Sequence, residues 1–388
     1  MSKKIKIIFI FGALGGGGAQ RQFGWLIDKI DKDKFEPVIL TIGPSVKDYE
    51  SHLDKYPDKE YLSEEAKVNE FTKFLLYRKL KDVCKIIFVR RKGFLKTQKK
   101  IYHSIKSENS QIIFFVTPMA AILGGLPSLI YSKAKIVHGV RGNGILLNYE
   151  KSLANLYHLC SQFYVDYFVC NSTDLVNNAI KSGIIKSKTK VIYNGVPIFF
   201  DIQKQSSKKT LRIGYIGRFE EVKNHDLFFN AIAQLDKDLD FSVHLYGTGS
   251  LENNLKAKAE ILQISHKVNF EGWATDVSEV LKTLDIVCLT SSFEGFNNSI
   301  SEAQMHGIPV VTTDCAGSNE IVKNGLTGYV VPRGNAEKFA IKLQHLITNH
   351  ALRHKFSIAA YSRSRKEFTI EKMCSNYESF FTEISSNH

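Results

Sequence analysis

The sequence predicts an α/β protein built from two doubly wound, Rossmann-like domains. Apolar runs of strand length alternate with helical segments in two successive series, the pattern of parallel sheets covered by helices. At 388 residues the chain is long enough for two domains that each bury a core. The polar stretch at 201–210 separates the two series. We therefore expect a first domain over 1–200, a linker at 201–210, a second domain over 211–366 and a C-terminal helix over 367–388.

The predicted strands are apolar runs bounded by turn residues. In the first series they lie at 5–10, 36–41, 111–116, 135–138, 166–170 and 189–193. In the second series they lie at 211–216, 241–246, 267–270, 285–289, 308–312 and 328–331. The last segment carries apolar residues at helical spacing from Phe368 to Ile384, so it needs an apolar surface on which to pack.

A glycine-rich loop, Gly15 to Arg21, follows the first strand and precedes a helix that contains Trp25. Glycine allows close approach to the backbone, so the exposed amides of Gly17 and Gly18 could cradle a phosphate or a sugar. The loop lacks the G-x-G-x-x-G spacing of dinucleotide-binding proteins, and a flexible turn is the alternative.

The charge-free run at 111–132 has the length of a membrane span, but two prolines and two glycines divide it. We interpret it as a strand at 112–116 followed by a core helix. The N-terminus leads straight into the first strand without the pattern of a signal peptide. The six cysteines show no C-x-x-C spacing and are expected to be reduced, as in a cytoplasmic protein.

The net charge of +13 arises from an excess of basic residues in the first half of the chain. Much of this excess lies at 73–106, where Lys and Arg interleave with aromatic and aliphatic residues. A basic amphipathic segment of this kind favours an anionic membrane surface, at about 1 kcal/mol per basic residue near the lipid. A solvated face is one alternative. A nucleic-acid site is another, but no nucleic-acid-binding module accompanies the segment, so we expect no nucleic-acid partner.

The predicted strand at 135–138 ends in His138, and Arg141 follows shortly after. Ligands of open α/β sheets bind at the carboxyl ends of the strands, so both side chains are candidates for a binding site. A lone histidine at such a position is also often structural, and that alternative stays open here.

Arg218 and Lys223 follow the first strand of the second domain and are spaced to converge on one anion. Fixed cations stabilise the charge that develops on a phosphate leaving group, an effect commonly worth about 3 to 4 kcal/mol per key donor. The alternative is a basic pair at a helix start with no ligand. Gly247 follows the next strand and suggests a tight turn, either beside a bound nucleotide or with no ligand.

Two carboxylates, Glu294 and Glu302, stand eight positions apart after the predicted strand at 285–289. Glu294 falls on a loop and Glu302 inside a helix predicted at 299–306. A carboxylate can accept two sugar hydroxyls at once, and the free amides of a helix N-terminus favour phosphate. Together they suit a nucleotide sugar, whereas ordinary surface acids are the alternative.

The segment from Asp285 to Val331 resembles the signature of the retaining family-4 glycosyltransferases, which have the GT-B fold. The matching residues are Glu294-Gly-Phe296, Glu302-Ala303, Gly307-Ile-Pro-Val-Val311, Thr313-Asp314, Gly317, Glu320-Ile-Val322 and Gly325-Leu-Thr-Gly328. In the first domain, Gly17-Gly-Ala-Gln-Arg21 is similar to the Gly-Gly-x-Glu/Gln-Arg loop of the family. The resemblance implies two Rossmann-like domains that face a central cleft.

The resemblance also implies roles at the donor site. Residues that match Arg218 and Lys223 bind the donor diphosphate in the family, so we expect both to be catalytic. Glu302 is expected to bind the ribose hydroxyls, and Glu294 the transferred sugar as a further catalytic residue. The other expected donor-binding residues are Gly17, Gly18, Gly247, Asn297, Asn298 and Ser299.

The acceptor site implied by the resemblance lies in the first domain. Its expected residues are Gly18, Arg21, His138 and Arg141, with His138 also a catalytic candidate. The family motif often continues His-Glu or His-Asp, whereas this chain has His138-Gly139, and this departure puts the histidine's role in question.

We therefore expect a retaining glycosyltransferase that uses a nucleotide sugar, with a UDP-hexose or UDP-N-acetylhexosamine ahead of GDP-mannose. The family's habits imply a glycan or polyprenyl-diphosphate-linked acceptor, a bacterial surface polysaccharide such as a capsule or lipopolysaccharide, and peripheral attachment to the inner face of the plasma membrane. No D-x-D motif stands at a suitable strand end, so we expect no metal or other cofactor. The alternatives are a sugar-nucleotide epimerase or hydrolase of the same fold, and a non-catalytic GT-B subunit that binds a partner.

Overall fold

The structure is a computed structural model that describes residues 4–12, 14, 18–43, 80–89, 93–131, 133–142, 161–198, 210–274 and 276–386. The chain forms two compact units. The first contains Met1–Gly195 together with Ile370–His388, and the second contains Val196–Thr369. The chain thus leaves the first unit slightly before the expected domain end at 200. Of the expected linker, only Thr210 lies within the described residues.

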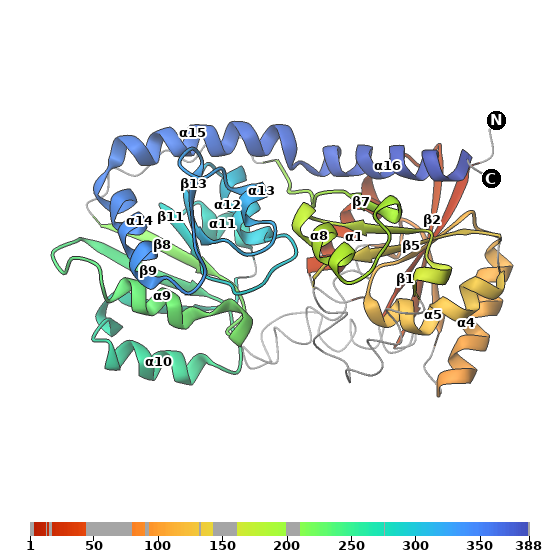
Figure 1. The fold of residues 1–388 in the computed structure, drawn as a ribbon, viewed down its shortest axis with the longest axis horizontal. Helices are drawn as coiled ribbons and strands as arrows, with labels where there is room; N and C mark the ends of the chain where they lie inside the picture. The colour runs from red at the N-terminus through yellow and green to blue at the C-terminus, as the bar shows by residue number, and fades with distance from the viewer. Residues whose placement is uncertain are drawn as a thin grey trace. The chain divides into compact units, whose positions relative to one another are not determined.

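A seven-stranded parallel sheet, of order β3-β2-β1-β4-β5-β6-β7, forms the centre of the first unit (Figure 1). Its strands are β1 Ile5–Phe11, β2 Phe35–Ile42, β3 Lys85–Val89, β4 Ile112–Phe115, β5 Lys135–Val140, β6 Tyr167–Cys170 and β7 Thr189–Val191. Every strand predicted for this half is found close to its expected bounds. The strand β3 was not predicted, because this edge strand is largely half-buried and lacks the fully buried apolar character of a central strand.

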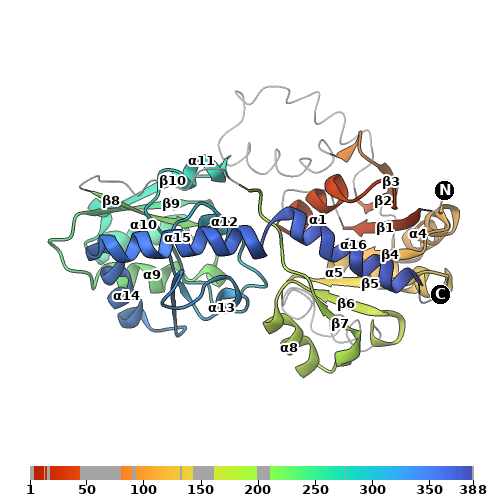
Figure 2. The same ribbon diagram turned by 90° about the horizontal axis from the view of Figure 1, so that it is seen from above.

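Helices cover this sheet, and the first and last of them, α1 and α16, lie side by side although they are far apart in the sequence. The described helices of the unit are α1 Gly18–Lys29, α4 Phe94–Glu108, α5 Pro118–Tyr131, α8 Thr173–Lys181 and α16 Ile370–Ser386. The C-terminal helix α16 lies beside α1 (Figure 2). Phe381 of α16 packs against Phe9 of β1 and Phe114 of β4, with ring centroids 6.2 and 6.1 Å away. The sheet of the first unit is therefore the apolar surface that buries the C-terminal segment.

The charge-free run at 111–132 contains β4 and the whole of α5, which confirms a strand followed by a helix. Glycines let α5 pack closely: a Cβ atom on Gly124 would lie 2.6 Å from the ring of Phe115, and one on Gly125 would lie 2.5 Å from the ring of Tyr164. Within the described part of the chain, no helix combines the length and the apolar character needed to cross a membrane.

A six-stranded parallel sheet, of order β10-β9-β8-β11-β12-β13, forms the centre of the second unit. Its strands are β8 Leu211–Ile216, β9 Phe241–Tyr246, β10 Val268–Gly272, β11 Ile286–Leu289, β12 Val310–Thr313 and β13 Gly328–Val331. Its helices are α9 His225–Ile232, α10 Glu252–Ile261, α11 Val277–Leu281, α12 Asn298–Met305, α13 Ser318–Ile321, α14 Ala336–Thr348 and α15 His350–Glu367. Helices α9 and α10 lie on one side of this sheet and α12 and α15 on the other (Figure 1). The predicted strands of this half are confirmed.

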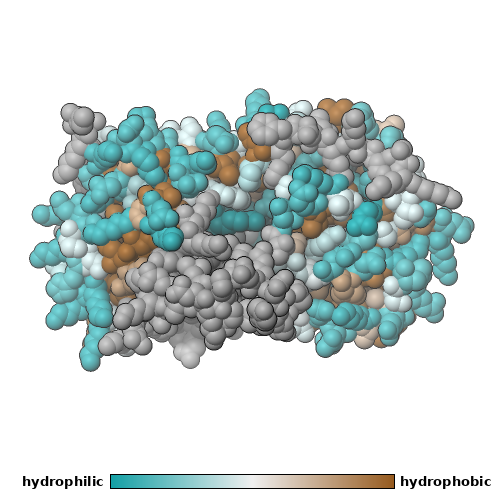
Figure 3. All heavy atoms as spheres, turned by 180° about the vertical axis from the view of Figure 1, so that it is seen from behind, coloured by the Kyte–Doolittle hydropathy of each residue, from teal (hydrophilic) through white to brown (hydrophobic). Residues whose placement is uncertain are grey.

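Most of the exposed large apolar side chains described in the first unit lie on two neighbouring helices; Phe163 and Ile185 lie elsewhere. Hydrophilic side chains cover much of the described surface on the face drawn in Figure 3, with smaller hydrophobic patches among them. Helices α4 and α5 pack against each other. Their exposed large apolar side chains are Phe94, Leu95, Leu126, Leu129 and Ile130. The exposed lysines of α4 are Lys96, Lys99, Lys100 and Lys106. Of the basic segment predicted at 73–106, residues 73–79 and 90–92 lie outside the described residues, and Lys85–Val89 form β3.

Candidate functional site

The loops after β8, β9, β11 and β12 meet at the carboxyl edge of the second sheet. Two glycines allow the closest approaches. A Cβ atom on Gly247, after β9, would lie 2.0 Å from the carbonyl oxygen of Gly217, after β8. A Cβ atom on Gly317, after β12, would lie 2.8 Å from the carbonyl oxygen of Gly295, in the loop after β11. The side chains carried by these loops are thereby brought into one small region.

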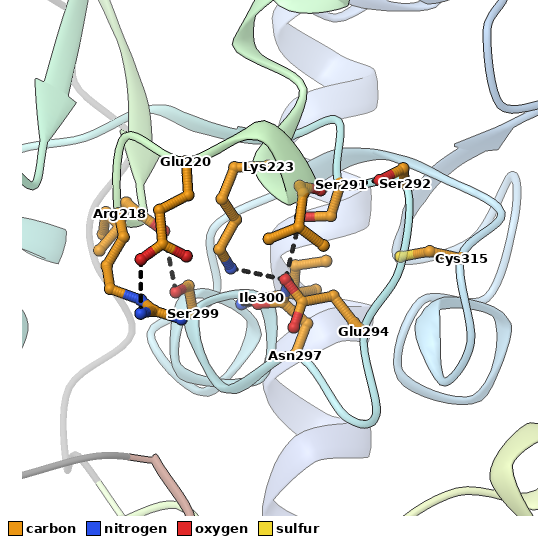
Figure 4. Close-up of polar contacts among 12 residues, drawn as sticks. Arg218, Glu220, Lys223, Ser291, Ser292, Glu294, Asn297, Ser299, Ile300 and Cys315 are labelled. Carbon is orange, nitrogen blue, oxygen red and sulfur yellow. Dashed lines mark hydrogen bonds and ion pairs between the residues drawn. The ribbon is translucent and has the colours of Figure 1, made fainter. Parts of the chain in front are cut away.

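Lys223 and Glu294, on the loops after β8 and β11, point toward each other at this edge (Figure 4). Nζ of Lys223 lies 2.5 Å from Oε1 of Glu294, and the hydroxyl of Ser291 donates to the same oxygen at 2.9 Å. The two charged side chains are 14% and 18% exposed. The ion pair is therefore largely shielded from water but still reachable by a ligand.

Arg218 belongs to a second ion pair beside the first (Figure 4). Its Nη1 lies 2.6 Å from Oε1 of Glu220, and these side chains are 63% and 39% exposed. The two cations that the sequence predicts to converge on one anion thus each hold a separate carboxylate. An incoming anion that used both cations would compete with both carboxylates.

The N-terminus of α12 lies at the same edge. Asn297 caps it, because its Oδ1 accepts a hydrogen bond from the backbone N–H of Ile300 at 3.2 Å. The buried amide nitrogen of Asn297 has no hydrogen-bond partner among the described residues. The hydroxyl of Ser299 donates to the carbonyl oxygen of Ile216, the last residue of β8, at 3.0 Å. Asn298 is the first helical residue, so the positive end of the helix dipole lies at this edge, a position that favours an anion.

Glu302 lies further along α12 and is only 6% exposed, while Glu294 stands on the loop before the helix. The predicted placement of one carboxylate in the helix and one on the loop is confirmed. Burying a carboxylate is costly unless hydrogen bonds satisfy it, so a carboxylate at this depth needs donors.

The charges at this edge come from side chains. They include the cations Arg218, Lys223 and Arg333 and the carboxylates Glu220, Glu294 and Asp314, with Glu302 further along α12. In the part of the chain that the structure describes, no group of three or more His, Cys, Asp and Glu side chains could hold a metal ion.

The first unit holds the remaining candidates, and His138 is the most deeply buried of them. The strand β5 continues past it to Val140, and its side chain is fully buried. Burial, helped by the nearby Arg141 guanidinium, lowers the pKa of His138 to about 3, so the ring is neutral at physiological pH. Its ring packs edge-on against Phe168 at 6.1 Å between centroids.

Arg141 connects the strand edge to the C-terminal helix. Its guanidinium lies over the ring of Phe23 at 4.8 Å, Nη1 donates to Oδ1 of Asn194 at 3.1 Å, and Nη2 donates to the hydroxyl of Tyr377 on α16. The guanidinium of Arg141, which was predicted from the sequence to bind the acceptor substrate, thus bonds side chains of its own unit.

The glycine-rich loop is described only in part. Gly17 lies outside the described residues, and Gly18 is the first residue of α1. The guanidinium of Arg21 lies 5.3 Å from the ring centroid of Trp25.

Four hydroxyl side chains contact Glu294 or the loop that carries Lys223, and none of them was predicted from the sequence to belong to the site. They are Tyr215, Thr290, Ser291 and Ser292. The one sequence signal for them is the Thr-Ser-Ser run directly after the buried strand β11.

The two parallel sheets with their covering helices define a Rossmann-like protein. The cation, the carboxylate and the helix N-terminus grouped at one carboxyl edge suit an anionic, hydroxyl-bearing ligand. Two family models match the chain: "Glycosyltransferase Family 4" at residues 16–198 and "Glycosyl transferases group 1" at 198–363. The chain belongs to the family-4 glycosyltransferases of the GT-B fold.

Similar curated proteins include bacterial glycosyltransferases. The chain is 28% identical over 217 residues to the lipopolysaccharide core biosynthesis glycosyltransferase LpsE of Rhizobium meliloti, a match that covers 55% of this chain and 63% of the relative. It is 29% identical over 193 residues to a lipopolysaccharide 1,6-galactosyltransferase of Salmonella typhimurium, covering 48% of this chain and 53% of the relative. The chain thus spans less than two thirds of these two relatives.

Similar solved structures show the same fold over nearly the whole chain. The structure of Anabaena Alr3699/HepE in complex with UDP and glucose is 17% identical with a TM-score of 0.78, and the match covers 98% of this chain and 100% of that one. A glycosyltransferase from Rickettsia africae is 19% identical with a TM-score of 0.78, covering 100% of both chains.

Proposed function

We propose that this protein is a retaining glycosyltransferase that moves a hexose or N-acetylhexosamine from a UDP-sugar to a glycan or polyprenyl-diphosphate-linked acceptor in the synthesis of a bacterial surface polysaccharide. The observation that carries this proposal is the Lys223–Glu294 pair beside the N-terminus of α12. The pair supports the proposal because an ammonium suits a diphosphate and a carboxylate suits sugar hydroxyls.

The names of similar proteins support the substrate classes. One, 25% identical over 270 residues, is an Escherichia coli galactosyltransferase whose name gives UDP-Gal as donor and a GlcNAc-diphosphoundecaprenol as acceptor. Another, 23% identical over 307 residues, is a capsular polysaccharide glycosyltransferase of Staphylococcus aureus. The similar Anabaena protein binds UDP and glucose.

Donor binding would exchange the partners of both cations. The diphosphate takes Lys223 from Glu294 and Arg218 from Glu220, and the helix N-terminus of α12 adds its backbone amides. Glu294 then turns to the hydroxyls of the transferred sugar, while Glu302 binds the ribose hydroxyls. The two cations and the carboxylates Glu294 and Glu302 thus each acquire a ligand atom of suitable chemistry, while Glu220, which is 39% exposed, is released to water.

The chemical step breaks the bond between the anomeric carbon and the β-phosphate oxygen. The acceptor hydroxyl oxygen forms its new bond to that carbon on the same face, and its proton passes to the leaving phosphate oxygen. Arg218 and Lys223 stabilise the charge that grows on the diphosphate as the bond breaks. Glu294 is not the nucleophile of a glycosidase-like double displacement, because the second carboxylate, Glu302, is committed to the nucleotide and does not flank the bond.

The two cations take the part that a metal ion plays at other diphosphate sites, so the proposed reaction needs no metal. Pre-incubation with a chelator is expected to leave turnover intact. A strong loss that magnesium restores would contradict this part of the proposal.

The inner face of the plasma membrane is the proposed location, reached through the exposed lysines of α4 and the exposed apolar residues of α4 and α5. Co-sedimentation with phosphatidylglycerol vesicles is expected to fall when Lys96, Lys99 and Lys100 are all changed to Ala. Equal binding by the variant, or no binding by the wild type, would remove this surface from the proposal.

The central experiment is calorimetric binding of UDP, GDP and ADP, followed by sugar derivatives of the nucleotide that binds. Glu302→Gln, checked for folding by thermal unfolding, is expected to lose affinity for the nucleotide. With the donor known, NMR of the product gives its anomeric configuration, which retention requires to match that of the donor. No binding of any nucleotide favours a non-catalytic GT-B subunit, and conversion of the donor without an acceptor favours an epimerase or hydrolase.

A further inference from the structure

Three consecutive backbone carbonyls in the loop that carries Lys223 are held by hydroxyl or amide donors from outside the loop. The backbone N–H and hydroxyl of Ser292 donate to the oxygen of Val222 at 2.9 and 3.1 Å. The hydroxyl of Tyr215 donates to the oxygen of Lys223 at 2.6 Å, and the hydroxyl of Thr290 donates to the oxygen of Asn224 at 2.8 Å. The loop is thus fixed by the last part of β8 and the residues that follow β11.

The hydroxyls of Tyr215 and Thr290 belong to one network and lie 3.2 Å from each other. Tyr215 donates to the carbonyl oxygen of Lys223 and accepts the backbone N–H of Thr290 at 3.3 Å. The hydroxyl of Thr290 lies 2.8 Å from the carbonyl oxygen of Asn224 and 3.2 Å from that of Lys223. Both side chains are fully buried, so water does not compete for these bonds.

The loop has a shape that needs outside support. It is a short 3₁₀ turn, Glu221–Lys223, followed by Asn224 in the left-handed region at φ 50°. A non-glycine residue at positive φ costs free energy, and such backbone persists where the surroundings hold it. The buried hydroxyls provide that hold directly beside Lys223.

The course of the lysine side chain is also restricted. A Cβ atom on Gly217 would lie 3.4 Å from Cε of Lys223, so the stem of the lysine runs close over this glycine. The ammonium then meets Glu294, whose Oε1 also accepts the hydroxyl of Ser291. Two consecutive residues therefore serve the two charged groups: Thr290 bonds the backbone beside Lys223, and Ser291 bonds the carboxylate of Glu294. Figure 4 shows Ser291 beside Glu294.

We propose that Tyr215 and Thr290 are positioning residues for the transfer reaction: their buried hydroxyls fix the Lys223 loop so that the ammonium stands where the β-phosphate of the donor arrives. The proposal rests on the proposed function, because it needs Lys223 to bind that phosphate. Positioning matters here since small displacements of a charged group at a reacting centre cost large factors in rate.

The test uses substitutions that remove one hydroxyl and little else. Tyr215→Phe and Thr290→Val are each expected to weaken UDP binding, and to lower turnover per folded molecule, by about three- to tenfold, the worth of one hydrogen bond. The affinity of both variants for UMP, which lacks the β-phosphate, is expected to stay within about twofold of the wild-type affinity. The reason is that the hydroxyls are proposed to act only through Lys223, which binds that phosphate. Thr290→Ser keeps the hydroxyl and is expected to restore wild-type affinity.

Two controls separate positioning from a general loss of stability. Tyr329→Phe removes a hydroxyl that bonds His345 at 2.9 Å elsewhere in the same unit, and it is expected to leave UDP affinity unchanged. In a Lys223→Ala background, adding Thr290→Val is expected to change UDP affinity by less than about twofold, because the group being positioned is gone.

The outcomes are distinct. If the wild type binds UDP and the variants Tyr215→Phe and Thr290→Val bind it equally well, the hydroxyls are structural only and the inference is wrong. The same conclusion holds if Thr290→Val lowers UDP affinity by the same factor with and without Lys223. If the wild type binds no nucleoside diphosphate, the proposed function fails and the inference fails with it. Should Thr290→Val fold poorly, Tyr215→Phe gives the same comparison by itself.

Discussion

The carboxyl edges of the two sheets carry similar residues but use them differently. At the edge of the second sheet, Lys223 and Glu294 face each other and remain partly exposed. In the first unit, His138 is fully buried, and Arg141 bonds Asn194 and Tyr377. A charged residue after a strand is therefore only a candidate for binding. Its burial and its partners decide whether it is available to a ligand or holds the fold together.

The largest expected effect tests the second edge. Lys223→Ala removes the cation proposed to meet the leaving diphosphate, and kcat/KM is expected to fall about 100- to 1000-fold, as for other preorganised charge-stabilising donors. The thermal midpoint should move little, because the loop is held through its backbone carbonyls and not through the ammonium. Steady-state kinetics with the identified donor measure the change. A fall in kcat/KM of less than about threefold would show that the Lys223–Glu294 pair is structural. The two sheet edges would then not differ in how they use their charged residues.

The next prediction tests the first edge. Arg141→Ala removes the guanidinium that donates to Asn194 and Tyr377, so the free energy of unfolding should fall by about 2 to 3 kcal/mol. Urea unfolding measures it, and Tyr377→Phe, which removes one accepting hydroxyl, should cost about 1 kcal/mol. UDP affinity is expected to stay the same. If Arg141→Ala instead keeps full stability and abolishes transfer, Arg141 is an acceptor ligand as the sequence analysis expects, and the comparison fails.

The sequence predicts the sheets well because the strands of parallel sheets are buried on both faces and read as continuous apolar runs. The edge strand β3 escaped prediction because it is only half-buried. At the site, Lys223 and Glu294 could be found because loops after neighbouring parallel strands meet at one edge. The roles of Tyr215 and Thr290 could not be found, since a hydroxyl that bonds a distant carbonyl has no sequence pattern of its own.

Acid should destabilise both units through buried histidines. Burial lowers the pKa of His138 to about 3 and that of His225 to about 4, whereas both would titrate near 6.5 in the unfolded chain. Above pH 6.5 both states are neutral; below it only the unfolded state gains the protons, so stability falls by up to about 1.4 kcal/mol per pH unit for each histidine. The loss continues until the pH reaches the folded pKa.

Thermal unfolding between pH 7.5 and 5 measures this slope. His138→Gln and His225→Gln are each expected to lower the midpoint at pH 7.5 and to flatten its pH dependence, because one titrating group is removed. His103→Gln, at an exposed position on α4, is the matched control and should leave the slope unchanged. Wild-type stability that does not change over this range would show that neither ring is protected from protonation in the way its burial implies.

The smallest expected effect compares the two ion pairs of the second edge. Glu220→Gln removes the exposed carboxylate that competes with a diphosphate for Arg218, and exposed pairs are worth about 0.2 to 1 kcal/mol, so UDP affinity should rise by up to about fivefold. Glu294→Gln also frees a cation, but it removes the carboxylate proposed to bind the sugar. It should therefore keep or improve UDP affinity while turnover falls. Equal effects of both variants on turnover would mean that Glu294, like Glu220, only occupies a cation until the donor arrives.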